Sequence, residues 1–198
     1  MRLKQVRNCN WMKKLTYLSF FFFSFLFYAQ VPKVSEEEMY EVINFIIQNG
    51  NKISKNFKII TEDPNIKQDF KHESVYFDDK ILKQYFNNAD IKSIKEQLKT
   101  ITQFSLNPKY ILNLRIIHED KLSSYSSDGK YFWTEFEKKH GKGGFLFVGK
   151  PIFTMDKKRV IINYGYYCGG LCGSGERVIL RKDKNRWIIE KVISGFIS

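Results

Sequence analysis

The residues best suited to do chemistry lie in one glycine-rich segment, Tyr164–Gly175 (YGYYCGGLCGSG). The segment holds five glycines and two cysteines, Cys168 and Cys172, four positions apart. Cysteines at this spacing could form a disulfide, hold a metal ion or act as a redox pair. Glycines at this density indicate backbone with positive φ, or the close approach of another group such as a phosphate. Each possibility makes a different demand on the rest of the chain.

A disulfide between Cys168 and Cys172 is the chemistry that the sequence favours. A metal site needs further ligands, and no spacing among the histidines would supply them; they are His72, His118 and His140. A redox-active dithiol usually has C-x-x-C ahead of a helix, whereas this spacing is one residue longer and a strand follows. Closing so short a loop contributes about 2 kcal/mol, so the disulfide would shape the loop more than stabilise the fold.

Familiar catalytic motifs are missing from the sequence. It contains no Gly-Lys-Ser/Thr phosphate loop, no kinase signature and no G-x-S-x-G elbow. Cys168 or Cys172 could pair with His140 as a thiol–imidazole couple, but oxidation of one cysteine onto the other competes with that role. The segment His118–Asp120 (HED) reads as a polar strand end, in which only the first and third side chains could cooperate. We therefore predict no metal and no cofactor, and we favour binding over catalysis.

The glycine-rich segment is also the candidate binding surface. In a strand, Tyr164 and Tyr166 would share one face with Cys168, and Tyr167 would point to the other. Tyrosines beside a glycine loop could stack on a sugar or a peptide, or they could form the rim of the core. An open basic groove containing Arg177 and Arg181 would favour the first interpretation. The predicted binding residues are Tyr164, Tyr166, Tyr167, Gly169, Gly170, Gly173 and Arg177.

The N-terminus has the pattern of a secretory signal peptide. Residues 1–14 carry five basic residues and no acid, and the following run Leu15–Tyr28 is uncharged and rich in phenylalanine. We predict cleavage after Ala29, which leaves a single domain over residues 30–198 in the periplasm or outside the cell. The alternative is an uncleaved anchor, because the uncharged run to Pro32 is at the short end of what spans a bilayer.

Length and charge narrow the class of partner. The chain has 198 residues and a net charge of +12, and three cysteines are too few for a disulfide scaffold. Without the leader the net charge is +7, and residues 130–198 alone carry +8. Outside the cytoplasm this charge points to anionic polymers, lipid headgroups or acidic proteins, and not to nucleic acid. A solvated lysine-rich surface is the plainer explanation.

The elements expected around the segment are helices followed by strands. The capping box Ser35–Glu38 starts a helix that a left-handed Gly50 would end. Further apolar periods predict helices over 79–86, 90–104 and 131–140, strands over 57–60 and 110–117, and a polar loop over 122–128. Four extended runs with short turns follow, over 145–153, 160–168, 176–182 and 187–193. This order predicts an α+β fold in which N-terminal helices pack on a C-terminal antiparallel meander of about four strands.

The segment Tyr167–Gly175 (YCGGLCGSG), followed by a strand, a charged turn and the sequence Trp-Ile-Ile, resembles a hairpin of uncharacterised exported proteins from Bacteroidota-type bacteria. The leader junction at Phe27–Gln30 is similar to leaders of the same group, and the resemblance covers residues 131–198. It implies export and the hairpin, and it carries no catalytic residue. We therefore expect an exported binding module that uses a disulfide-closed hairpin; the alternatives are a secreted hydrolase with a site between helices and sheet, and a membrane-tethered interaction protein.

Overall fold

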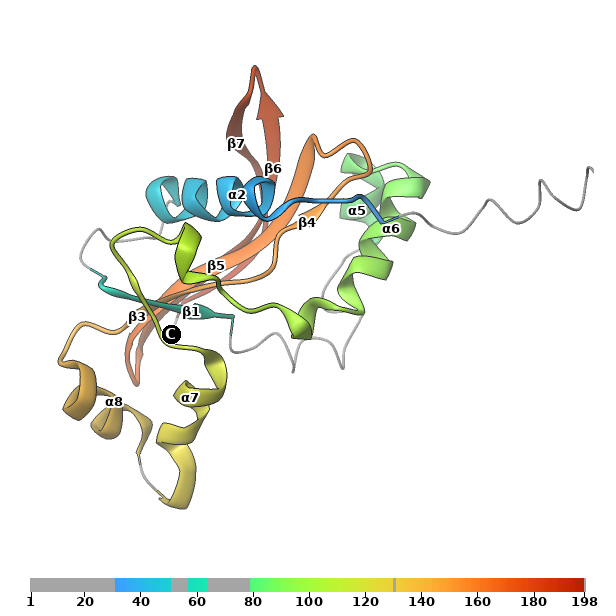
Figure 1. Ribbon diagram of the computed structural model, residues 1–198. Helices are drawn as coiled ribbons and strands as arrows, with labels where there is room; N and C mark the ends of the chain where they lie inside the picture. Colours follow the sequence, from blue (N-terminus) through green and yellow to red (C-terminus); the bar gives the residue numbers. More distant parts are fainter. Residues whose placement is uncertain (1–30, 51–56, 64–78, 130, 198) are drawn as a thin grey trace, which may run out of the picture. The chain divides into compact units, whose positions relative to one another are not determined.

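Seven strands form one mixed sheet, in the order β2–β1–β3–β5–β6–β7 with β4 also paired to β5 (Figure 1). The computed structural model describes residues 31–50, 57–63, 79–129 and 131–197, so the predicted leader and His72 lie outside the described residues. The strands are β1 Ile59–Glu62, β2 Arg115–Ile116, β3 Phe145–Val148, β4 Ile152–Phe153, β5 Arg159–Gly169, β6 Cys172–Asp183 and β7 Arg186–Ile197. The helices are α2 Glu36–Asn49, α5 Asp79–Tyr85, α6 Asn88–Leu98, α7 Glu119–Ser123 and α8 Phe132–His140, with short 3₁₀ helices η2 Ile101–Gln103, η3 Pro108–Tyr110 and η4 Ser124–Gly129.

The α+β class is confirmed, but the predicted topology is wrong in one respect. Strands β3, β5, β6 and β7 are antiparallel neighbours in chain order, as the short turns predict. Strand β1, however, lies between β2 and β3 and runs parallel to both. Parallel pairing needs a long crossover, and α5 to α8 lie in the chain between β1 and β3. Most helices are therefore mid-chain, and the sheet is larger than the four-stranded meander.

Two predicted strands are shorter than expected because the backbone breaks them. The run 110–117 contributes only the two residues of β2, since η3 precedes it and Asn113 adopts a left-handed φ of 64°. The run 145–153 divides into β3 and β4 around Pro151, which has no N–H to donate to a ladder. The predicted polar loop 122–128 is instead helical, and it is divided between α7 and η4.

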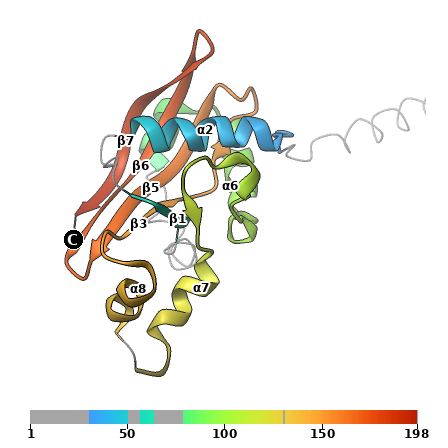
Figure 2. The same ribbon diagram turned by 60° about the vertical axis from the view of Figure 1, so that its left-hand side comes forward.

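Helix α2 covers one face of the sheet, and Figure 2 shows it lying across the strands. Its capping box forms as predicted: Ser35 Oγ accepts the N–H of Glu38, and a Glu38 oxygen accepts the N–H of Ser35. Gly50 ends the helix in an extended conformation (φ −61°), not the predicted left-handed one. Beneath α2 lie buried side chains at alternate positions of β5 and β6, namely Val160, Ile162, Tyr164, Val178 and Leu180. Within the described residues, no helix combines the length and the apolar character needed to cross a bilayer.

Two separate helical groups cover the opposite face. Helices α5 and α6 pack on the side chains of β4, β5 and β6 that point away from α2, with Ile161 and Ile179 at the centre. Helices α7 and α8 pack with η4 on Ile59 and Phe145 (Figure 1). Because both faces of β5 and β6 are covered in their central parts, side chains reach solvent mainly at the ends of these strands.

Candidate functional site

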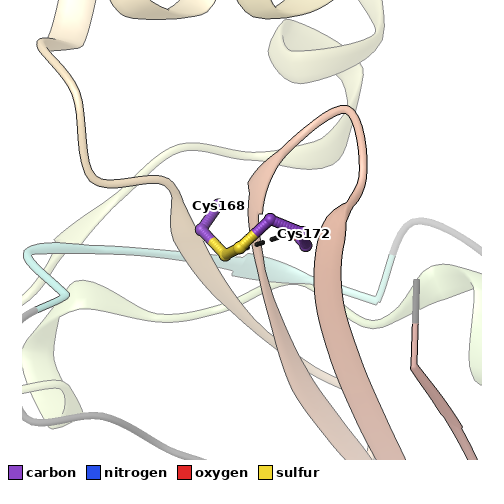
Figure 3. Close-up of a disulfide and its surroundings, with 2 residues drawn as sticks. All are labelled: Cys168 and Cys172. Atoms are coloured by element: carbon purple, nitrogen blue, oxygen red, sulfur yellow. Dashed lines mark hydrogen bonds between the residues drawn. A yellow bond between two sulfur atoms is a disulfide. The ribbon is translucent and has the colours of Figure 1, made fainter.

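The predicted disulfide is confirmed at the turn between β5 and β6 (Figure 3). Cys168 and Cys172 have Cα atoms 5.1 Å apart and enclose only three residues. Gly169 pairs directly with Cys172, and the register shifts between Tyr167 and Gly169. The disulfide therefore closes the hairpin at its end. We name the segment Cys168–Cys172 the clamped tip.

The clamped tip presents an apolar side chain to solvent. Leu171 is 93% exposed, the highest value among the large apolar residues that the structure describes. Tyr131, which is 64% exposed, lies beside Gly170 of the same tip, because a Cβ atom added at Gly170 would come within 2.5 Å of the Tyr131 hydroxyl oxygen. Single exposed apolar residues are common on protein surfaces. What distinguishes Leu171 is that a disulfide-closed turn holds it out to solvent, with the exposed Tyr131 close to the same turn. Neither Leu171 nor Tyr131 was among the predicted binding residues.

The three tyrosines predicted to bind a ligand are largely buried or packed against other side chains of the domain. Tyr164 is fully buried beneath α2, and its hydroxyl donates to Glu176 Oε2 at 2.6 Å. The ring of Tyr166 packs in a tilted arrangement on that of Phe57, with centroids 5.3 Å apart. Tyr167 is half-buried among three rings, those of Phe145, Phe147 and Phe196. Tyr164 therefore cannot contact a ligand, and the interpretation of these tyrosines as part of the core and its rim describes the structure better.

The glycines at positions 165 and 175 of the hairpin allow neighbouring groups to pack closely against their Cα atoms. None of the hairpin glycines has a positive φ; among the glycines that the structure describes, that conformation is found at Gly141, Gly143 and Gly144. Instead, a Cβ atom at Gly165 would overlap the Phe147 ring and the backbone of β6, and one at Gly175 would overlap the rings of Phe147 and Phe196. Gly173 is buried in β6 as well. Of the three predicted binding glycines, Gly170 is exposed at the tip and Gly169 is half-buried.

Arg177 does not line an open basic groove. The Arg177 residue is buried, and its Nε donates a hydrogen bond to Asn163 Oδ1 at 2.8 Å. The side-chain nitrogen of Asn163 in turn donates to a carboxylate oxygen of Asp63 at 3.1 Å. Arg181 lies 3.4 Å from a carboxylate oxygen of Glu190. These guanidinium groups are therefore engaged within the fold and do not form the open basic groove that would favour binding; a binding role of Arg177 stays a prediction.

His118 meets a buried carboxylate that the sequence analysis missed. Its Nδ1 lies 2.8 Å from Oε1 of Glu62, which is only 7% exposed at the end of β1. The same carboxylate accepts the backbone N–H groups of Leu106 at 2.7 Å and Glu119 at 3.0 Å. Ser105 Oγ lies 3.3 Å from that same Nδ1. A catalytic triad needs the hydroxyl and the carboxylate on opposite ring nitrogens, so this cluster cannot relay a proton in that way.

His140 occupies a different polar cluster, and its neighbours define its tautomer. Arg115 Nη2 lies 2.7 Å from its Nδ1 and can only donate, so this nitrogen accepts. The ring proton is then on Nε2 and faces the Tyr125 hydroxyl oxygen at 2.9 Å. Burial, and then the positive charges of Arg115, Lys121 and Lys139, lower the pKa of His140. His140, His118 and the cysteines therefore do not converge on one site.

This environment predicts a loss of stability in mild acid. The unfolded chain takes up a proton near pH 6.5, whereas folded His140 resists it because its pKa is lowered. The free energy of unfolding should therefore fall as the pH drops below about 6.5, by at most about 1.4 kcal/mol per unit, until the folded pKa is passed. Urea denaturation at pH 7.5, 6.5 and 5.5 measures this slope. The variant His140→Gln should lack this part of the slope, and an identical slope in both proteins would contradict the assignment.

No group of three or more metal-ligating side chains lies close enough to hold an ion among the residues that the structure describes. Comparison with protein-family models, curated proteins and solved structures finds no match for this chain. The geometry of the clamped tip is therefore the main guide to function.

The sequence did contain a signal that could have identified Leu171 as a site residue, since it is the one apolar residue between the two cysteines.

Proposed function

We propose that this chain is an exported, non-enzymatic binding module that contacts a partner in the cell envelope through its clamped tip. The observation that carries the proposal is the 93% exposure of Leu171 on a turn closed by a disulfide. Burying a leucine side chain in a partner contributes about 1.5–3 kcal/mol. The disulfide holds the turn before contact, which lowers the entropy lost on binding. Tyr131 extends the contact beside it.

Export is the second part of this proposal. A basic and then apolar N-terminal segment is typical of a signal peptide, and cleavage after Ala29 would release residues 30–198. A disulfide persists in oxidising compartments such as the periplasm, which agrees with that destination. The resemblance of residues 131–198 to exported bacterial proteins supports the same compartment. If the leader is retained, the same domain acts as a membrane-tethered interaction protein.

A hydrolase is the weaker alternative. Cys168 and Cys172 are bonded to each other and so offer no thiolate. His118 and His140 are held in separate clusters, and Ser105 contacts the wrong nitrogen of His118 for proton relay. Binding needs none of these groups to be activated, so the exposed tip supports it better.

Site-specific photo-crosslinking in intact cells tests the proposal. A photoreactive residue at position 171 should give one discrete adduct in the envelope fraction. The matched control is position 112, because Leu112 is also an exposed leucine (75%) but lies outside the hairpin. Introducing Tyr131→Asp should reduce adduct formation at position 171 about tenfold, by placing a charge in the contact. The intact mass of the same material reports whether the leader has been removed.

Two outcomes would contradict the proposal. The first is the same set of adducts at positions 171 and 112, which would indicate random collision. The second is a full-length, unembedded product in the cytosol, which would remove the oxidising compartment.

Replacing both cysteines by serine should weaken adduct formation several-fold without abolishing it, since Leu171 stays while the turn loosens.

A further inference from the structure

A hollow of about 400 Å³ lies between α2 and the start of β7, at the opposite end of β6 from the clamped tip. One face of α2 forms its first wall, at positions spaced three and four apart, and two residues of β7 form the second. The volume falls within the range of small-molecule sites. The lining residues are Glu41, Asn44, Phe45, Gln48, Arg186 and Trp187.

The wall of this hollow contains an unused hydrogen-bond donor. Trp187 is only 5% exposed, and its indole Nε1 has no acceptor among the described residues. Buried donors are normally paired, because leaving one unpaired forfeits the hydrogen bonds it makes in water. Its ring packs edge-on against Phe153, so the core holds the indole in place. The Nε1 atom itself lies out of a ligand's reach, so the indole serves the hollow as a fixed apolar wall.

The hollow also has a cation, Arg186, at its rim. Lys182 Nζ lies 3.1 Å from Glu41 Oε2, so the one carboxylate of the lining is already paired. Arg181 is likewise paired with Glu190. Arg186, in contrast, has no ion-pair partner within the part of the chain that the structure describes. Its guanidinium is free to bind an anion at the rim of the hollow.

We propose that this hollow binds a small amphipathic monocarboxylate, with its apolar body against Phe45 and Trp187 and its carboxylate on Arg186. A single guanidinium matches one planar carboxylate through two parallel hydrogen bonds. A dianionic phosphate fits less well, because Lys182 is engaged and Glu41 would repel the second charge. The site is independent of the clamped tip, so the two proposals can fail separately.

The test uses the indole N–H signals in a two-dimensional ¹H–¹⁵N spectrum of the protein purified from the envelope. Trp187 reports on the hollow, and Trp133, which belongs to α8 and packs in a different cluster, serves as the internal reference. The probes are octanoate and its neutral analogue, methyl octanoate. Octanoate should shift the Trp187 signal in a saturable way and leave Trp133 in place, and methyl octanoate should bind about tenfold more weakly.

Three variants separate the carboxylate contact from general charge. Arg186→Gln should weaken octanoate binding about tenfold and bring it to the level of the methyl ester. Lys184→Gln removes the same charge from the same turn, outside the lining, and should change binding less than about twofold. Arg186→Lys keeps the charge without the forked geometry and should give an intermediate affinity. Arg186 is exposed, so these variants should retain the remaining spectrum of the wild type.

The proposal is overturned if neither probe gives a saturable shift of Trp187. It is also overturned if Arg186→Gln and Lys184→Gln weaken octanoate equally, or if both probes bind with the same affinity. None of these results would touch the contact at Leu171, which the photo-crosslinking measures separately.

Discussion

Replacing Glu62 by alanine is expected to lower the free energy of unfolding by about 3–4 kcal/mol. The carboxylate is buried and accepts two backbone N–H groups from different segments, those of Leu106 and Glu119, in addition to the contact with His118. Alanine would leave both N–H groups without an acceptor. Loss of the contact with the half-exposed His118 imidazole contributes less to the fall in stability, because water can replace the carboxylate there. Urea denaturation monitored by tryptophan fluorescence measures the change.

Two comparisons separate this role from charge alone. Glu62→Gln keeps one acceptor oxygen, so it should cost about half as much. Glu96→Ala removes a carboxylate of α6 that is paired with a single exposed lysine, Lys99, just past the end of the helix, and it should cost at most about 0.5 kcal/mol of stability. If the alanine variants at positions 62 and 96 lost similar stability, the view of Glu62 as the centre of three segments would be wrong.

The second large effect is expected at Gly165, where alanine should cost at least about 3 kcal/mol or prevent folding. An added Cβ would overlap the carbonyl oxygen of Ser174, the Cα atom of Gly175 and the ring of Phe147. Two of these three are backbone atoms of the neighbouring strand, and they cannot move aside without opening the β5–β6 ladder. Thermal and urea denaturation of the purified variant measure the loss.

Gly149 supplies the matched control. An added Cβ there would make ordinary contacts of 3.4 Å or more with Asn163, and its φ is not in the left-handed region. Gly149→Ala should therefore change stability by no more than about 0.5 kcal/mol, or raise it slightly by restricting the unfolded chain. Equal tolerance at both positions would show that β5 and β6 can separate at Gly165, contrary to the packing described above.

These two positions show why the hairpin is rich in glycine. The sequence offers two explanations for its glycines, positive φ and close approach. The structure selects the second for Gly165 and Gly175, because the Phe147 ring lies over both. That ring comes from β3, and only the pairing of β3 with β5 brings it there. The distance in sequence between Phe147 and Gly175 explains why no local pattern could have identified it.

The site residues that the sequence predicts correctly depend on local contacts, and those that it misses depend on contacts between distant segments. The disulfide is a local feature, since two cysteines four apart at the end of a hairpin meet whatever surrounds them. The exposure of a tyrosine is not local: alternation places Tyr164 and Tyr167 on opposite faces, but both faces are covered by other elements. Glu62 and His118 are 56 positions apart and meet only because β1 and the start of α7 lie side by side.

The sequence by itself determined the short-range features of this protein: the helix that Ser35 and Glu38 begin, the antiparallel run β5–β6–β7 and the disulfide. Each depends on residues within a few positions of one another, whose backbone preferences and hydrogen bonds act without the rest of the fold. The parallel entry of β1 beside β3, the burial of Glu62 against His118 and the burial of Tyr164 beneath α2 came only from the tertiary structure. Those outcomes depend on which segments far apart in the sequence pack together and exclude water, and local sequence patterns do not specify that packing.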